Sequence, residues 1–458
     1  MTFEEIRTAL SRAARPRYAA ILCLGFASGL PVMMVFSKLS FWLREVGIDR
    51  STIGGFYAVS LAYSLKVLWA PVVDRLRLPV LTRLLGQRRS WMLTALAGVM
   101  AGLLIIGASD PAVSLVPTIA GALVLAYSGA TLDISVDAWR IESAPDDDQA
   151  NMAALYILGY RFAIMFAGLG MVIASKTSWN FAYSIMAASM GLAVLVVLAI
   201  AEPQRSERIK EAGAGFLSRM REAVVEPFLQ IARRFGPWLV PILLIVGLYR
   251  LSDFTMGVMA SPFYVDLGYT KDQVGWITGL FGPWPVVAGA FLGGAAAVRF
   301  NLLPALLAGA VLTLLTNGAF ALLALAAGPG LDAAANGDAT AIVATPPVWG
   351  LFGAIVGDNL AAGYVGSVFI AYLSSLTDRR FAATQYALFS SAYSLFCKIM
   401  ASTVSGPLSE AVGWAGFFAI TALFALPPAL VIIHVMRRGP DTAKGRPPPG
   451  ETGASAKA

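Results

Sequence analysis

Nine charged residues interrupt long apolar runs of the sequence. The acidic ones are Asp133, Asp137, Asp253 and Asp358, and the basic ones are Lys38, Lys66, Arg161, Arg250 and Lys398. An unpaired charge at the centre of a bilayer costs about 2.5–3.5 kcal/mol. If these runs cross a membrane, the charged groups must therefore face one another or a wet cavity. There, carboxylates can carry protons and cations can hold anions.

Asp133 and Asp137 are the first candidates for proton chemistry. They are four residues apart, so on a helix they share one face about 6 Å from each other. Their repulsion favours binding of a proton by one of them, which a proton carrier requires. Alternatively, Asp137 acts as a gating contact, because Arg140 follows it by three residues and a basic loop lies nearby.

Arg250 and Asp253 are three residues apart, so they can form a pair within one helix or share an outside partner. Asp253 is the acidic residue that we prefer for proton coupling. Two alternatives stay open, a permanent counter-ion to Arg250 and a contact in a binding pocket.

The elements that must position these groups are membrane helices. Of the 458 residues, 57% are hydrophobic and 13% are charged, and the mean hydropathy is +0.71, which excludes a soluble globular protein. Apolar runs long enough to cross a bilayer predict twelve spans. They cover residues 19–43, 52–73, 91–109, 112–138, 151–175, 179–200, 237–262, 271–296, 300–328, 346–374, 384–410 and 412–436.

Basic residues predict the orientation of the spans. The net charge is +7, and 25 of the 34 Lys and Arg residues fall on one side of the predicted spans against four on the other. This bias marks the cytoplasmic face and places both termini there, so no nucleic-acid partner is implied. The predicted parts are a basic N-terminus at 1–18, six-helix bundles at 19–200 and 237–437, a cytoplasmic linker at 201–236 and a disordered cytoplasmic tail at 438–458.

The two halves of the sequence resemble each other. Residues 46–54 (VGIDRSTIG) align with 267–275 (LGYTKDQVG), in each case between the first two spans of a half. Two six-helix halves in the same orientation are the layout of the major facilitator superfamily, in which cargo binds between the halves. We therefore expect an all-α membrane protein with that fold.

Five segments resemble the AmpG family of muropeptide permeases, over residues 19–436. They are 24–31 (LGFASGLP), 65–75 (LKVLWAPVVDR), 133–140 (DISVDAWR), 156–161 (YILGYR) and 378–388 (DRRFAATQYAL). The resemblance implies a proton-driven importer of the bacterial inner membrane. Its cargo would be N-acetylglucosaminyl-anhydro-N-acetylmuramic acid, with or without a peptide, returned from the periplasm for peptidoglycan recycling. The family also resembles acetyl-CoA transporters, so membership indicates the mechanism better than the cargo.

Such a cargo needs cations for its carboxylates and neutral polar or aromatic groups for its sugars. Arg161 is the preferred anion contact because a guanidinium holds a carboxylate through two hydrogen bonds, although a buried ion pair with Asp133 or Asp358 is an equal alternative. Lys38 is expected to line the entrance or to reach the membrane surface. The remaining substrate-binding candidates are Lys66, Arg250, Asp358, Asn359, Gln385, Lys398, Tyr156 and Tyr160.

Asp74 and Arg75, followed by Gly86, Arg88 and Arg89, resemble an expanded form of the superfamily's loop between spans 2 and 3. With Arg140, Asp74 and Arg75 are predicted to form a cytoplasmic gate. Marking the orientation of the chain is the alternative role for the basic residues here.

Several classes of protein are not indicated. The two cysteines, Cys23 and Cys397, lie in apolar runs as packing residues, and no metal, cofactor or catalytic site is predicted. The sequence has no nucleotide-binding Gly-Lys-Ser/Thr loop, which argues against ATP as the energy source. A monomer is expected. The alternatives are a transporter of another anionic cargo, such as an acyl-CoA or a drug-like molecule, and a membrane assembly factor that transports nothing.

Overall fold

The computed structural model describes residues 16–144, 148–203, 233–377 and 382–440, and every regular element in these ranges is a helix. Most of the predicted basic N-terminus, most of the central linker and nearly all of the predicted tail lie outside these ranges. The chain divides into two compact units. The first contains Met1–Lys210 and Tyr269–Leu280, and the second contains Glu211–Gly268 and Phe281–Ala458.

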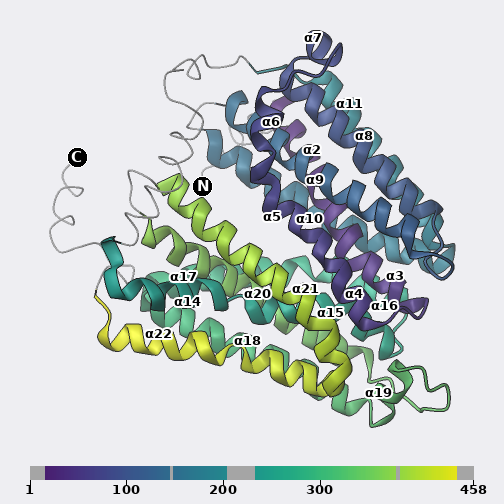
Figure 1. Ribbon diagram of the computed structural model, residues 1–458, viewed down its shortest axis with the longest axis vertical. Helices are drawn as coiled ribbons and strands as arrows, with labels where there is room; N and C mark the ends of the chain where they lie inside the picture. The colour runs from purple at the N-terminus through teal and green to yellow at the C-terminus, as the bar shows by residue number, and fades with distance from the viewer. Residues whose placement is uncertain (1–15, 145–147, 204–232, 378–381, 441–458) are drawn as a thin grey trace, which may run out of the picture. The chain divides into compact units, whose positions relative to one another are not determined.

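The first unit is a bundle of long helices in which α8, α9 and α11 run side by side (Figure 1). Two of them begin at serine caps: the hydroxyl of Ser114 accepts a hydrogen bond from Val116 N–H, and that of Ser178 accepts one from Phe181 N–H. The elements are α2 (Pro16–Met33), η1 (Met34–Lys38), α3 (Leu39–Glu45), α4 (Arg50–Phe56), η2 (Tyr57–Ser60), α5 (Leu61–Leu65), η3 (Lys66–Leu68), α6 (Ala70–Arg75), α7 (Leu81–Leu85), α8 (Gln87–Ala108), α9 (Leu115–Ser143), α10 (Gln149–Lys176), α11 (Trp179–Ala199) and α16 (Lys271–Gly275).

The second unit has a core of aliphatic and aromatic side chains between α14, α18, α20, α21 and α22. Its elements are η7 (Gly236–Trp238), α14 (Leu239–Leu248), α15 (Leu251–Asp266), α17 (Pro283–Phe300), α18 (Leu302–Ala326), α19 (Gly330–Ala335), α20 (Val348–Leu376), α21 (Ala382–Leu423) and α22 (Leu426–Arg438). The π-helical turn η8 (Trp276–Phe281) belongs to the first unit as far as Leu280, and its last residue, Phe281, belongs to the second.

Ten helical stretches of the described residues are long and apolar enough to cross a membrane. Their outer surfaces are apolar as well, because large side chains such as Leu195, Phe291 and Leu322 are 65%, 78% and 68% exposed. A helix that is apolar on all sides suits lipid on one face and protein on the other. The helices therefore form a multi-pass membrane protein.

The predicted span at 52–73 is not one regular helix. Residues 50–75 form three short α-helices interrupted by the 3₁₀ turns η2 and η3, so they are missing from the ten long stretches. A 3₁₀ turn inside a helix often marks a hinge. Gly54 and Gly55, near the end of α4, lower the helix propensity just before the first interruption.

The predicted boundary between the spans at 384–410 and 412–436 lies close to a break in the structure. Helix α21 runs through both, but Gly413 has φ 71° and ψ 176°, so the helix breaks there. A Cβ at this position would overlap the carboxylate of Asp332, whose Oδ1 accepts the Trp414 N–H at 2.8 Å. Only glycine fits both restraints.

The repeated sequence segments also have the same local geometry. Gly47 and Gly268 have φ values of 87° and 82°, and two residues later Asp49 and Thr270 each cap the next helix with a side-chain oxygen. Each half therefore begins its second helical segment with the same turn.

Candidate functional site

A cluster of polar side chains lies in the first unit where η3 and α10 face α9. Lys66 Nζ is 3.5 Å from Oδ2 of Asp133, and the Tyr156 hydroxyl donates to Oδ1 at 3.5 Å. Ser28 of α2 lies beside both Asp133 and Tyr156. The side chains of Lys66 and Asp133 are 33% and 15% exposed, so water reaches the lysine more easily than the carboxylate. The cluster unites two separate predictions, because Lys66 was expected to bind cargo and Asp133 to carry a proton.

Neighbouring side chains hold this cluster in place. Trp69 Nε1 donates to Thr131 Oγ1 at 3.1 Å and so fixes the chain after η3 against α9. The Tyr63 hydroxyl is buried against Gly129 and has no hydrogen-bond partner among the described residues. Sequence reasoning missed Tyr63. Its position three residues before Lys66, on the same helical face, was the available signal.

Other predicted residues of the first unit lie near the cluster in different roles. Tyr160 packs its ring against Gly29, and Arg161 is half-buried. Arg161 makes no ion pair within the described part of this unit. One of its two predicted alternative partners, Asp133, is bound to Lys66 instead. The carboxylate of Asp137 is 3.8 Å from Arg140, and its side chain is 44% exposed. This geometry matches the alternative in which Asp137 pairs with Arg140.

In the second unit an ion pair lies at the break between α14 and α15. Arg250 Nε is 3.0 Å from Oδ2 of Asp253, and the Thr313 hydroxyl of α18 donates to Oδ1 at 3.5 Å. Gly366 of α20 lies beside the guanidinium, where a Cβ would make an ordinary van der Waals contact with Nη1 at 3.5 Å. Both side chains are about four-fifths buried. The predicted pair is therefore present, with Arg250 directly before α15 and Asp253 in the first turn of that helix.

Further candidates surround this pair. Asp358 of α20 lies beside Thr316 and makes no ion pair within the described residues of this unit, and its neighbour Asn359 is half-buried. Asn317, which sequence reasoning missed, donates to the Ser252 hydroxyl at 2.7 Å. An amide in an apolar span was its signal. On α21, Gln385 is buried and Lys398 is half-buried.

The predicted gate residues are arranged differently from the expectation. Asp74 binds Arg88 at 2.5 Å, and Arg88 also holds Glu142 through Nη2 and Nε at 2.6 and 3.0 Å. Glu202 accepts hydrogen bonds from the backbone N–H groups of Arg88 and Arg89. Arg75 is exposed and Arg140 pairs with Asp137. Arg88 is thus the centre of this cluster; the loop motif included it, but the predicted gate residues were Asp74, Arg75 and Arg140.

The sequence pattern of the Major Facilitator Superfamily matches residues 21–335. AmpG 4 of Rickettsia felis, named as a transporter, is 31% identical to the chain over 92% of this chain and 97% of its own. The anhydromuropeptide permease of Escherichia coli K12 is 30% identical over 93% of this chain and 80% of its own. The chain belongs to the AmpG family of the major facilitator superfamily. It is a membrane transporter and not an enzyme.

Solved structures agree with the transporter fold. A bacterial homologue of the human lysosomal transporter Spinster matches with a TM-score of 0.63 at 14% identity, over 94% of this chain and 98% of its own. The nucleoside transporter NupG matches with a TM-score of 0.66 at 13% identity, over 91% of this chain and 99% of its own. At these identities the likeness establishes the fold alone.

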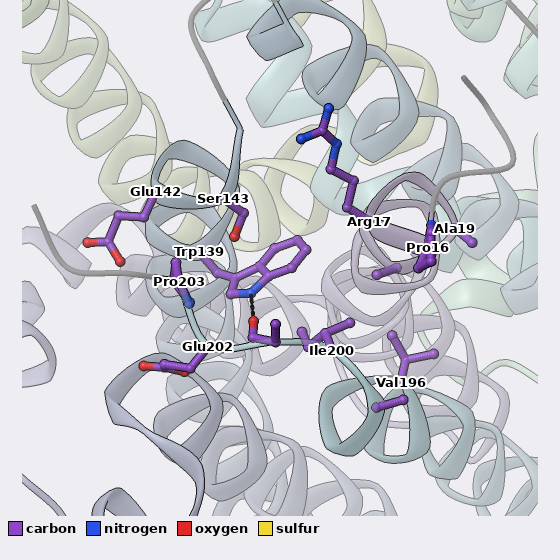
Figure 2. Close-up of a pocket in the computed structure, with 13 residues that line it drawn as sticks. Pro16, Arg17, Ala19, Trp139, Glu142, Ser143, Val196, Ile200, Glu202 and Pro203 are labelled. Atoms are coloured by element: carbon purple, nitrogen blue, oxygen red, sulfur yellow. Dashed lines mark hydrogen bonds between the residues drawn. The ribbon is translucent and has the colours of Figure 1, made fainter. Parts of the chain in front are cut away.

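The transporter also has a cavity of about 890 Å³ in its first unit, away from the Lys66–Asp133 cluster. Figure 2 shows Trp139, Ile200 and Val196 around it, with Arg17 at another edge. Trp139 Nε1 donates to the Ala201 carbonyl at 3.2 Å, the dashed line in Figure 2. None of the predicted substrate-binding residues lines this cavity.

Proposed function

We propose that this transporter imports anhydromuropeptides together with protons across the bacterial inner membrane. The observation that carries the proposal is the relationship to the Escherichia coli anhydromuropeptide permease, at 30% identity over 93% of the chain. The cargo would be N-acetylglucosaminyl-anhydro-N-acetylmuramic acid with or without its peptide. Buried cation and carboxylate pairs in each unit support a coupled, anion-binding mechanism.

We propose twelve membrane crossings in two repeats, with both termini in the cytoplasm. The stretch Phe389–Arg438 contains 50 residues, which as one helix would be about 75 Å long, more than twice the hydrocarbon thickness of about 30 Å. The break at Gly413 divides it into two crossings, and the interrupted residues 50–75 supply another. The bias of basic residues supports the orientation.

In the first unit, Asp133 competes with the cargo for Lys66. While Asp133 is ionised, it holds the ammonium group, and a proton on Asp133 releases Lys66 for a carboxylate of the cargo. Arg161 supplies a second anion contact, and Tyr156 and Tyr160 supply aromatic faces and hydroxyls for sugar rings.

In the second unit, Asp253 holds Arg250 by the same principle, and its protonation frees the guanidinium. The polar groups that would contact the cargo here are Asp358, Asn359, Gln385 and Lys398. Asp74, Arg75, Arg140 and Asp137 would belong to the cytoplasmic gate. The centre of that gate is Arg88.

The test uses purified transporter in liposomes with labelled N-acetylglucosaminyl-anhydro-N-acetylmuramic acid outside. An acidic exterior should drive accumulation that an uncoupler abolishes, and one proton moved across 100 mV is worth about 2.3 kcal/mol, or about fifty-fold accumulation. Unlabelled cargo should compete, whereas an acyl-CoA should not. Absence of uptake under every gradient would overturn the proposal, and competition by acyl-CoA would favour another anionic cargo.

A further inference from the structure

Lys38 is a buried lysine whose environment differs from those of the other cations in the spans. It ends η1, a π-helical turn between α2 and α3, and only 4% of the residue is exposed. Its Nζ donates to Thr278 Oγ1 at 3.4 Å, its one hydrogen-bond partner among the described residues. Thr278 lies in the second π-helical segment, η8, and its hydroxyl donates to the Val274 carbonyl at 2.7 Å.

No carboxylate pairs with Lys38 in the described part of the first unit. The elements packed against η1 are α2, α3, α5, α9, α10, α11 and η2, and η8 supplies Thr278. The acidic groups of these helices and of the adjoining α16 pair with other cations. These pairs are Asp133 with Lys66, Asp137 with Arg140, Glu142 with Arg88, Glu45 with Lys271, and Asp272 with Lys176. The other titratable or charged groups on these elements are Arg17, Tyr18, Cys23, Arg44, Tyr57, Tyr63, Tyr127, Tyr156, Tyr160, Arg161 and Tyr183.

The partner of Lys38 belongs to a docked segment. Tyr269–Leu280 packs with the first unit, although the chain on both sides of it belongs to the second unit. Lys271 binds Glu45 at 2.8 Å, and Asp272 binds Lys176 at 2.9 Å and also Ser175. Gly275 and Gly279 lie directly against Gly168 of α10. Docking of this segment brings Thr278 to the amine of Lys38.

We propose that Lys38 couples docking of Tyr269–Leu280 to the binding of a proton. An ammonium ion loses its hydration on burial. In the docked arrangement the hydroxyl of Thr278, which donates its own proton to the Val274 carbonyl, replaces that water, and no described carboxylate of the first unit pairs with the ammonium. A neutral amine can make the same hydrogen bond without that cost. Docking therefore releases the proton of Lys38, and undocking in contact with water takes it back. This inference deepens the proposed proton-coupled transport and rests on it for its physiological meaning.

The test follows the segment itself. Ile277 is 5% exposed in the docked segment, so a cysteine there should react with a membrane-impermeant maleimide only after undocking. The experiment uses the full-length protein in liposomes, with Ile277→Cys introduced and the two native cysteines removed by Cys23→Ala and Cys397→Ala. Each labelling rate is divided by that of the denatured chain at the same pH, which removes the titration of the thiol. Ala182→Cys, fully buried in α11, is the protected control.

With Lys38 present, relative labelling should rise up to ten-fold for each pH unit of acidification over the range in which the amine titrates. Lys38→Met should give low labelling that does not change with pH. Lys38→Arg, which keeps its charge, should give high labelling at every pH. Equal pH profiles for Lys38 and Lys38→Met, or equal protection of Lys38→Arg and Lys38→Met, would overturn the inference.

Folding is checked by gel filtration, and Lys38→Gln replaces Lys38→Met if the latter aggregates. The assay contains no cargo, so its outcome is independent of the uptake experiment. The expected labelling without muropeptide uptake would contradict the proposed cargo and leave the coupling role of Lys38 intact. Proton-driven uptake of muropeptide together with labelling that does not depend on Lys38 would support the proposed cargo and contradict the coupling role of Lys38.

Discussion

Lys66 and Asp133 form an ion pair between η3 and α9, with Nζ 3.5 Å from Oδ2 and the Tyr156 hydroxyl on the other carboxylate oxygen. The contact is longer than a charge-assisted hydrogen bond, which spans about 2.7–2.9 Å. Under the proposed mechanism the carboxylate exchanges the lysine for a proton, and the lysine exchanges the carboxylate for an anion.

The first prediction separates the structural role of this pair from its transport role. Lys66→Met leaves a mostly buried carboxylate without its cation and should lower the free energy of unfolding by about 1–3 kcal/mol, less than for a fully buried pair because Lys66 is 33% exposed. Lys66→Met combined with Asp133→Leu should recover most of that stability. Proton-driven uptake should be lost in both variants. Thermal unfolding in detergent and liposome uptake measure the two effects, and uptake by the double variant would contradict the assignment.

The second prediction concerns Asp253. Asp253→Asn keeps the shape of the side chain and removes its ability to exchange a proton, so accumulation driven by a pH gradient should be lost while exchange of labelled for unlabelled cargo continues. Thr313→Val is the matched control, because it removes only the hydrogen bond at 3.5 Å. Full pH-driven accumulation by Asp253→Asn would leave the counter-ion role as the explanation of this pair.

The third prediction compares two arginines of the same loop region. Arg88 is 7% exposed and binds Asp74 and Glu142, so Arg88→Gln should destabilise the protein by about 2–4 kcal/mol. Arg75→Gln removes an exposed charge and should change stability by less than about 0.5 kcal/mol. Equal thermal unfolding of the two variants would show that Arg88 does not hold this region together.

The fourth prediction addresses the break in α21. Gly413→Ala forces a side chain into a positive φ and against Asp332, and should cost about 1–3 kcal/mol. Gly318→Ala is a matched control in α18, where a Cβ meets no atom within 4 Å, and should be neutral or stabilise by up to about 1 kcal/mol. Thermal unfolding in the same detergent distinguishes them. Similar melting of both variants would argue against a strained turn.

Much of the fold follows from residue types along the chain. Apolar runs predicted the long helices, and the alignment of residues 46–54 with 267–275 anticipated two turns with matching positive-φ glycines. The interruptions at η2 and η3 were not predicted, because an apolar run indicates a membrane span but not the hydrogen-bond type of each of its turns. The break at Gly413 could be placed only approximately, since its necessity comes from Asp332, far away in the sequence.

The site was predictable as a set of residues but not as a set of contacts. A charged residue within an apolar run is visible in the sequence alone. For this reason Asp133, Lys66, Arg250 and Asp253 could all be named as candidate site residues in advance. Their partners depend on how helices pack, so only pairs close in the sequence were anticipated, Arg250 with Asp253 and, as an alternative, Asp137 with Arg140. Arg88 lay in a basic loop, where sequence offers no means of choosing one arginine over another.

The place of Tyr269–Leu280 in the first unit has a consequence for biosynthesis. A ribosome adds about 5–20 residues per second, so this segment follows Pro203 by about 3–13 s. During that interval the newly made first unit lacks Thr278 over Lys38 and Lys271 beside Glu45. During biosynthesis Lys38 and Glu45 therefore lack these partners in the newly made first unit. The first unit is completed only after translation of the second half of the chain has begun.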